Sequence, residues 1–372
     1  MLSIGIDRKA RQPINIEARA SRTIFVAGKR GSGKSYTLGR IIEEVHAQGE
    51  HLIIVIDPLA VFWNTGIPEP GHQPLPTREI IPGDPATVLG PGLVDAIQGH
   101  GIEVARMWLN PSDLTPSAWC SLFGYKLTEP QGIALYRAVR SLRKQRFSID
   151  DIAEALAADE ETGDRTKSAV TNRLLMAVDW DLFADTYTPT LDVLKPGHIN
   201  VIDVASFEPG PQSIRNLVAK LLIEQLFRAR LASRRAEVLG QPSTFPKVWL
   251  VIDEAHDFCP ATGTALAKSA LIRWVKEGRQ PGLSLATATQ QPSALAFDLV
   301  SQCDYLVIHR LTLQDDVRTV GRLASTYAKD LTAFLKGVKK TGEAIFVDDA
   351  LERVAVGRVL PRRSRHGGGE AL

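Results

Sequence analysis

The stretch TIFVAGKRGSGKS at residues 23–35 decides the fold of this chain. It consists of a short apolar and β-branched run, a glycine-rich loop, and the start of a segment whose apolar residues recur at helical spacing. The pattern G-x-x-x-x-G-K-[ST] is matched here by Gly28, Gly33, Lys34 and Ser35. This pattern is informative only between a strand and a helix, and both are predicted on its two sides. The alternative, an ordinary glycine-rich turn, fits this context poorly.

A loop of this kind binds phosphate through its backbone. Its N–H groups surround phosphate oxygens, and the N-terminus of the next helix adds a partial positive charge. We expect Lys34 to reach the β- and γ-phosphates and the Ser35 hydroxyl to coordinate Mg²⁺. The expected cofactors are therefore a nucleoside triphosphate, taken as ATP, and Mg²⁺. The residues expected to bind the nucleotide are Gly28, Lys29, Arg30, Gly31, Ser32, Gly33, Lys34, Ser35 and Tyr36.

A second element with catalytic character is VWLVIDEAH at residues 248–256. Its apolar run predicts a buried strand that ends at Asp253 and Glu254, and ligands of open α/β sheets bind at such strand ends. We expect Asp253 to hold Mg²⁺ and Glu254 to polarise the attacking water. The letters DEAH also occur in two-lobed helicases. We exclude that class, because the chain after Glu254 is too short for a second lobe of roughly 150 residues.

Composition places the chain among ordinary globular proteins. It has 372 residues, of which 44% are hydrophobic and 23% charged, and its formal net charge is +2. This near-neutral charge does not by itself indicate a nucleic-acid partner. Its three cysteines lie far apart and predict neither a metal site nor a disulfide framework. With no apolar leader and no run of about 20 apolar residues, we expect a cytoplasmic protein without a membrane partner.

Strand-like and helical segments alternate along the chain, which predicts an α/β fold with a mainly parallel sheet. Continuous apolar runs typical of buried strands occur at 51–57, 198–205, 247–254, 283–290 and 304–311. Residues 64–101 are rich in proline and glycine, and we expect long surface loops there. A long helix is predicted at 211–238.

The segment 112–190 differs from the rest. It predicts three amphipathic helices, and the second of them begins at Ser148 with Asp151 at capping-box distance. We therefore expect a core of residues 1–111 and 191–372, interrupted by a helical insertion at 112–190.

Taken together, these motifs resemble the HerA–FtsK superfamily of ring-forming motor ATPases, and HerA most closely. The segments that carry the resemblance are AGKRGSGKSYTLG, VIDPLAVF, LNPSDLT, LTEPQGIALYRAV, LKPGHINVIDVA, VIDEAHDF, VKEGRQPGLSLATATQQPS, SQCDYLVIHRL with QDDV, and SRHGG. The resemblance covers about residues 20–368 and implies a RecA-like P-loop NTPase core. HerA proteins usually carry a β-barrel before this core. Gly28 stands near the start of this sequence, so we expect a chain without that barrel.

The resemblance also assigns roles to single residues. Arg279, in the E-G-R segment, matches the arginine that reaches the neighbouring subunit's nucleotide, and the alternative is a surface ion pair. Gln290 resembles the polar residue that senses loss of the γ-phosphate, with a plain strand-end amide as its alternative. Asp57 resembles a second acidic residue near the water, although an aspartate before Pro58 is also a common turn residue. Arg310 matches a family arginine and could equally form a structural ion pair.

The expected assembly is a homo-oligomer, specifically a hexameric ring, because a single-lobed core needs an arginine from another chain. The resemblance implies double-stranded DNA as the partner. Clusters of Lys and Arg at 137–146, 228–235 and 336–340 could contribute to its binding in a ring, although each cluster alone is more often a solvated helix face. The leading hypothesis is an ATP-driven DNA translocase or helicase. The second is a non-motor ATPase that assembles or gates a nuclease or antiphage effector, and the third is a conjugation or packaging ATPase.

Overall fold

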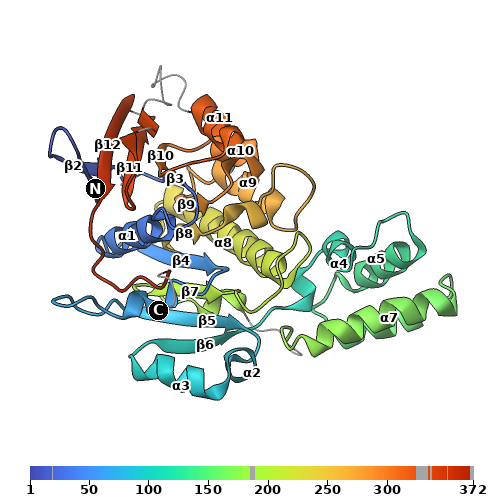
Figure 1. The fold of residues 1–372 in the computed structure, drawn as a ribbon. Coiled ribbons are helices and arrows are strands. Elements are labelled where there is room, and N and C mark those ends of the chain that lie inside the picture. Colours follow the sequence, from blue (N-terminus) through green and yellow to red (C-terminus); the bar gives the residue numbers. More distant parts are fainter. Residues whose placement is uncertain (19, 185–188, 324–333, 336, 350, 369–372) are drawn as a thin grey trace.

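One large sheet organises the protein. The computed structural model describes residues 1–18, 20–184, 189–323, 334–335, 337–349 and 351–368. Within them lies a twelve-stranded sheet in the order β2-β1-β12-β11-β10-β3-β9-β8-β4-β7-β5-β6 (Figure 1). Neighbouring strands from β10 to β6 pair in parallel, whereas those from β2 to β10 pair antiparallel. The mainly parallel α/β fold predicted from the sequence is confirmed.

The parallel strands are β3 (Thr23–Ala27), β4 (His51–Asp57), β5 (Thr77–Pro82), β6 (Glu103–Met107), β7 (Ile199–Asp203), β8 (Lys247–Ile252), β9 (Leu283–Thr289) and β10 (Tyr305–Ile308). The antiparallel edge consists of β1 (Leu2–Asp7), β2 (Pro13–Ile16), β11 (Glu343–Asp348) and β12 (Arg353–Val359). These four edge strands were not predicted from the sequence.

The helices that accompany the sheet are α1 (Lys34–His46), α2 (Pro85–Leu89), α3 (Pro91–Gly99), α8 (Ile214–Val238), α9 (Lys268–Glu277), α10 (Phe297–Val300) and α11 (Gln314–Leu323). Four more helices stand apart, namely α4 (Pro116–Leu122), α5 (Pro130–Leu142), α6 (Ile149–Ala157) and α7 (Asp164–Asp179). Short 3₁₀ turns are η1 (Trp63–Gly66), η2 (Pro111–Asp113), η3 (Thr190–Val193), η4 (Ala255–Asp257) and η5 (Pro292–Ala294).

Both faces of the parallel strands are buried, which explains their continuous apolar runs. Successive side chains of a strand point to opposite faces. In β3, Ile24 and Val26 pack with Leu38 and other apolar residues of α1. The intervening Phe25 belongs to the cluster that includes Leu221 and its neighbours on α8. The phosphate-binding loop is therefore held between a buried strand and a buried helix face.

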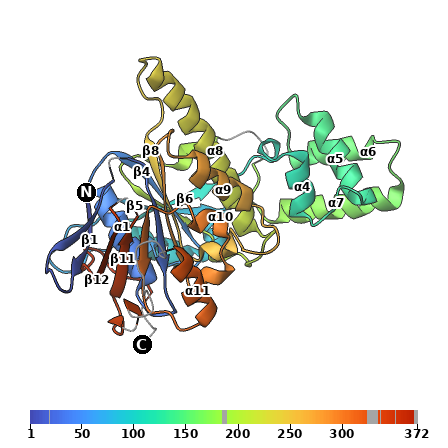
Figure 2. The same cartoon turned by 90° about the horizontal axis from the view of Figure 1, so that it is seen from above.

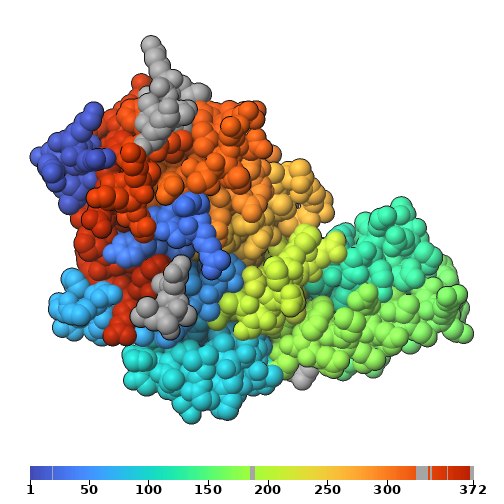
Figure 3. All heavy atoms as spheres, viewed as in Figure 1, coloured from blue at the N-terminus to red at the C-terminus, as the bar shows by residue number. Residues whose placement is uncertain are grey.

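Helices α4 to α7 form a lobe beside the sheet, which Figures 2 and 3 show from two sides. Their apolar faces share one buried cluster, with Trp119, Leu135 and Leu174 among its members. The predicted capping box is present, since the Ser148 hydroxyl accepts from the N–H of Asp151 at 3.2 Å and the Asp151 carboxylate accepts from the N–H of Ser148 at 2.7 Å. Within the described residues, no helix combines the length and apolar character needed to cross a bilayer.

The prediction that residues 64–101 form loops with little regular structure was wrong. This segment contains β5, α2 and α3, and β6 follows it directly. Pro85 and Pro91, read as breakers, stand at the first turns of α2 and α3, where a missing N–H costs nothing. The apolar part of β5 is short, which hid it from a search for long apolar runs.

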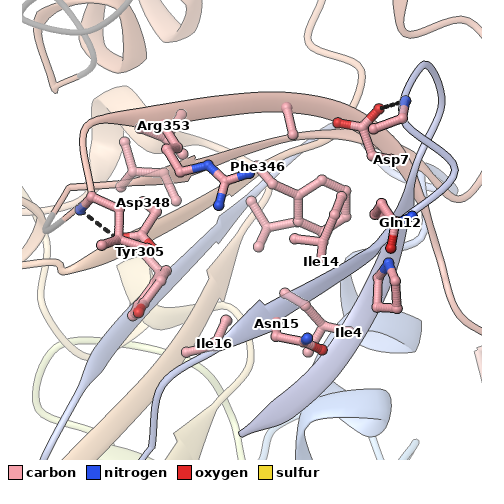
Figure 4. A pocket seen from close by; sticks show the side chains of 17 residues that line it. Ile4, Asp7, Gln12, Ile14, Asn15, Ile16, Tyr305, Phe346, Asp348 and Arg353 are labelled. Atoms are coloured by element: carbon pink, nitrogen blue, oxygen red, sulfur yellow. Dashed lines mark hydrogen bonds between the residues drawn. The ribbon is translucent and has the colours of Figure 1, made fainter.

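A cavity of about 160 Å³ lies at the antiparallel edge of the sheet (Figure 4). Side chains of β1 and β2 line one side of it, and those of β10, β11 and β12 line the other. Ile14 and Phe346 are among its apolar lining residues. It contains none of the residues predicted to bind the nucleotide.

Candidate functional site

The glycine-rich loop between β3 and α1 has the backbone that its sequence requires. Gly31 and Gly33 adopt φ values of 71° and 109°, in the region that glycine tolerates best. Gly28 is needed for a different reason, because a Cβ there would lie 2.5 Å from the Ser32 hydroxyl and 2.6 Å from the Cβ of His309. The start of the loop at Gly28 is thus tightly packed against Ser32 and His309, whereas its tip at Arg30 is exposed.

Lys34 points into this loop from the first turn of α1. Its side chain is buried, and Nζ donates a hydrogen bond of 3.4 Å to the carbonyl of Lys29. Burial lowers the pKa of Lys34, while the negative charges of Glu254 and Asp253 act in the opposite direction. Within the described residues its ammonium thus donates to a backbone carbonyl of the loop, and a phosphate oxygen could replace this acceptor.

Ser35 and Asp253 join the loop to the end of β8. The Ser35 hydroxyl donates to the Asp253 carboxylate at 2.5 Å. Asp253 is buried, and this burial raises its pKa, while the Ser35 hydrogen bond lowers it. A hydroxyl and a carboxylate are hard oxygen donors of the kind that Mg²⁺ takes beside phosphate. The pair therefore fits the predicted metal position, and no cluster of three or more His, Cys, Asp or Glu suited to a metal occurs among the described residues.

Glu254 is held in a defined orientation by the end of β9. Its φ of 46° is unusual for a residue other than glycine. The Gln290 side-chain amide donates to Oε1 of Glu254 at 2.5 Å, and the Gln290 backbone N–H donates to Oε2 at 3.2 Å. Nδ1 of His256 lies 3.4 Å from the same Oε2 and 3.0 Å from the Thr289 hydroxyl. Two residues predicted separately, Glu254 and Gln290, are therefore direct partners.

Asp57 lies at the end of β4 with both carboxylate oxygens engaged by the turn that follows. They accept from the backbone N–H groups of Leu59 at 3.0 Å, Val61 at 2.7 Å and Phe62 at 2.7 Å. Complete burial raises the pKa of Asp57 to about 7, against the lowering effect of the Phe62 hydrogen bond. This geometry suits the turn role that the sequence left open. Its predicted role near the water stays a prediction.

Behind Asp57 lies a pair of acidic residues that sequence reasoning missed. Asp203, at the end of β7, stands opposite Asp57 in the strand register. Its carboxyl group hydrogen bonds with that of Glu79, a buried residue of β5. Burial first, and then the charge of Asp203, raise the pKa of Glu79 well above its usual range. The glutamate in the short strand TREIIP gave no signal that it would meet Asp203.

His309 was also missed, although it precedes Arg310 in the quoted segment VIHRL. It is fully buried beneath the phosphate-binding loop, with Nε2 2.8 Å from the Thr37 hydroxyl and Nδ1 2.9 Å from the carbonyl of Glu343. Burial lowers the pKa of His309 to about 4. Since a carbonyl only accepts, Nδ1 donates to Glu343, and His309 ties α1 to the antiparallel edge.

Arg279 and this site lie at opposite ends of the parallel strands. Arg279 comes just before the start of β9, whereas Gly28 comes just after the end of β3, and β3 and β9 are parallel neighbours. The seven residues of β9 span about 23 Å. Arg279 is exposed, and no ion pair to it occurs among the described residues. It is thus not brought together with the phosphate-binding loop of its own chain.

Arg310 and most described members of the basic clusters are on the surface, but Arg230 in the second cluster is buried. Arg310 is exposed, and its carbonyl accepts from the N–H of Lys29 at 2.9 Å. Arg137, in the first cluster, pairs with Asp159 at 2.8 Å. Lys336, in the third cluster, lies outside the described residues.

The chain matches the family described as "Helicase HerA, central domain" over residues 4–226. It is 23% identical over 391 residues to the DNA double-strand break repair helicase HerA of Pyrococcus furiosus, covering 95% of this chain and 68% of that protein. It is 26% identical over 183 residues to the probable helicase MJ1565 of Methanocaldococcus jannaschii, covering 49% of this chain and 34% of that one.

Two solved structures share the fold. VirB4 of Thermoanaerobacter pseudethanolicus aligns with a TM-score of 0.63 and 17% identity, over 97% of this chain and 96% of that one. The bacterial conjugative coupling protein TrwBdeltaN70 aligns with a TM-score of 0.52 and 14% identity, over 99% of this chain and 92% of that one. At these identities the likeness concerns the fold alone. The family match covers more than half of the chain, and the chain therefore belongs to the HerA helicase central-domain family.

Proposed function

We propose that this protein is an ATP-hydrolysing ring motor that translocates or unwinds double-stranded DNA. The observation that carries the proposal is the 2.5 Å hydrogen bond between Ser35 and Asp253, which joins the phosphate-binding loop to the acidic end of β8. Lys34 and Glu254 flank this contact on the two elements. A loop for phosphates, hard oxygen donors for Mg²⁺ and a carboxylate for the water then meet in one place.

In this proposal each residue has one task. Lys34 binds the β- and γ-phosphates together with the backbone from Gly28 to Tyr36, and Ser35 and Asp253 hold Mg²⁺, which neutralises phosphate charge when bound. Glu254 orients the attacking water, and Gln290 keeps the Glu254 carboxylate in position and would sense a change in it. Asp57 supports the turn beside the site.

The sixth task, stabilising the transition state, falls to Arg279 of a neighbouring subunit. Its exposed side chain lies where the parallel strands begin, away from the nucleotide site of its own chain. This position supports action on the nucleotide of another chain. An arginine supplied in this way is worth 10³–10⁵ in rate. A contact between the Arg279 side of one subunit and the nucleotide side of the next joins two different surfaces, so it is heterologous. Repeated contacts of this kind close into a ring when the rotation between subunits closes, and we propose six subunits. The cytoplasmic location expected from the sequence stays a prediction.

A second candidate function is a non-motor ATPase that assembles or gates a nuclease or another effector. It is favoured by the lobe of α4 to α7, where Leu175, Met176 and Val178 of α7 are 56%, 42% and 49% exposed. Exposed apolar residues gathered on one helix are typical of a surface that meets a partner.

The test that separates the two is ATP turnover with and without duplex DNA, at several salt concentrations. A motor on DNA should be stimulated by duplex, and the stimulation should fall steeply with salt because phosphate contacts release counterions. Glu254→Gln serves as the control for contaminating ATPases. Turnover that is independent of DNA, in a preparation that hydrolyses ATP, would reject the translocase and favour the effector hypothesis.

A further inference from the structure

The last turns of α8 project beyond the sheet (Figure 2). They lie next to the loop that carries Arg279, at the end of the sheet where the parallel strands begin. The helix α8 has 25 residues and is about 37 Å long. The strand β7, which precedes it in the chain, has five residues and spans only about 17 Å, so α8 is longer than the sheet it packs against. The projecting end is apolar and basic, since Val238 and Leu239 are 69% and 77% exposed and Arg235 is exposed without an ion pair among the described residues. Val238 and Leu239 thus give the end of α8 an exposed apolar tip beside Arg235.

A buried arginine connects this end of α8 to the loop that carries Arg279. Arg230 is 1% exposed, and its Nε donates to the carbonyl of Pro281 at 2.7 Å. Its Nη1 pairs with Glu237 at 3.1 Å and also donates to the carbonyl of Phe245. Three segments therefore meet at one guanidinium: α8, the loop of Arg279, and the segment that leads into β8.

The surrounding contacts make this junction rigid. The Arg230 guanidinium is the first cause that lowers the pKa of Glu237 to about 2, so the Glu237 carboxylate is charged at neutral pH. The buried Ser233 hydroxyl accepts from the N–H groups of Thr244 at 3.0 Å and Phe245 at 3.1 Å. Loss of the Pro281 carbonyl would leave a buried N–H of Arg230 without its acceptor, which is costly, so Arg230 holds the loop of Arg279 in place.

The edge that carries the nucleotide site is complementary to this projecting end. Leu59, after β4, is 47% exposed, and Glu208, after β7, is exposed. Asp257 follows Glu254 on the same edge. Arg30 and Arg310 are exposed on this side too, so the complementarity concerns Leu59, Glu208 and Asp257, which offer apolar and acidic groups to the apolar and basic projection.

We propose that the end of α8 and the Arg279 loop form one docking element for a second copy of this chain, and that Arg230 positions Arg279 within it. This inference rests on the proposed action of Arg279 between subunits. The partners of Arg230 are Pro281, Glu237 and Phe245, and it acts on Arg279 by holding the Pro281 carbonyl, two residues further along the chain. Docking of the α8 end then brings the arginine to a fixed place at the neighbouring site.

The first test uses Arg230→Lys, which keeps the charge but loses the planar fork. We expect nucleotide affinity, measured with a fluorescent ATP analogue, to stay within about twofold, and turnover to fall by about 10²-fold, the size of effect that a displacement near 1 Å produces. The matched control is Arg78→Lys, since Arg78 is also largely buried and binds the Val193 carbonyl and Glu103. That variant should keep its turnover. Glu237→Gln is a milder second variant, with a smaller loss in the same direction.

Mixed oligomers separate positioning from general damage. Arg230→Lys subunits mixed with Glu254→Gln subunits should regain activity, because some sites combine an intact Glu254 with an intact Arg279 loop. Arg230→Lys mixed with Arg279→Ala should not, because both lesions affect the same docking element. Recovery of ATP turnover in both mixtures would overturn the role of Arg230. So would recovery in neither mixture, if Arg279→Ala and Glu254→Gln subunits restore turnover when they are mixed with each other. If that last pair fails as well, the proposed action of Arg279 between subunits fails first.

The docking surface has its own test. Val238→Asp combined with Leu239→Asp places charge on the exposed end of α8 without disturbing a buried group. Mass photometry with nucleotide and Mg²⁺ should show assembly shifted to at least about tenfold higher concentration, while the melting temperature of the dissociated chain is unchanged. Assembly at the wild-type concentration would show that this end of α8 does not meet a second copy.

Discussion

The buried carboxyl pair behind the site gives a sharp prediction about stability. Glu79 and Asp203 share a hydrogen bond, and Glu79 is 1% exposed on β5, where its Oε2 has no hydrogen-bond partner within the described residues. Two carboxylates cannot donate to one another, so one of the pair must carry a proton. The pKa of Glu79 is raised well above its usual value of 4.5, first by burial and then by Asp203 and Asp57, and this assigns the proton to Glu79.

The consequence is a loss of stability with rising pH. Between pH 4.5 and the raised pKa, the folded chain keeps a proton that the unfolded chain releases, so unfolding becomes easier as pH rises. The slope from this group is about 1.4 kcal/mol per pH unit. Glu79→Gln replaces the neutral acid by a neutral amide that can still donate to Asp203. The unfolding free energy of Glu79→Gln should equal that of the wild type near pH 4.5. Above this pH it should exceed the wild-type value by a difference that grows with pH at this slope.

The assay is urea unfolding of both proteins at several pH values from 5 to 8, without nucleotide. The difference in unfolding free energy should increase as pH rises, at about 1.4 kcal/mol per pH unit while Glu79 keeps its proton. Asp57, whose pKa is about 7, contributes equally to both proteins and cancels in the difference. A difference that stays constant from pH 5 to 8 would refute the assignment of the proton to Glu79.

Three further predictions concern the nucleotide site and the assembly. Lys34→Ala should abolish nucleotide binding, whereas Glu254→Gln should retain binding and lose turnover by several orders of magnitude. Equilibrium binding and phosphate release measure these two effects separately. A Glu254→Gln enzyme that turns over ATP at nearly the wild-type rate would exclude Glu254 as the base. Gly28→Ala should weaken nucleotide binding and lower the melting temperature, since the added Cβ meets Ser32 and His309 at 2.5 and 2.6 Å; normal binding would mean that the loop adapts freely. Mass photometry with nucleotide and Mg²⁺ should show a species near six protomers, and a fully active monomer would exclude the ring.

The parts of the site that sequence predicted are those encoded locally. Gly28 to Ser35 lie between an apolar strand and an amphipathic helix, and Asp253 and Glu254 end an apolar run, so spacing alone indicates both elements. The contact between Ser35 and Asp253 follows once the strands are parallel, because their carboxyl ends share one edge.

The parts that were missed depend on strand order. Glu79 meets Asp203 only because β5 pairs with β7, and His309 meets Thr37 only because β10 lies beside β3. Nothing in the flanking residues specifies these neighbours. The antiparallel edge was missed for a related reason: β1 and β12 lie far apart in the sequence, and their pairing is revealed only when the sheet is assembled.

The central claim, a site completed by a second subunit, is tested most directly by mixing two inactive proteins. Arg279→Ala subunits should bind ATP and fail to hydrolyse it, and Glu254→Gln subunits should fail for a different reason. In mixed rings some sites combine an intact Glu254 with an intact Arg279 from the neighbour, so ATP turnover should partly return. No return of turnover at any mixing ratio, with co-assembly confirmed by mass photometry, would contradict the account and leave Arg279 outside the catalytic site.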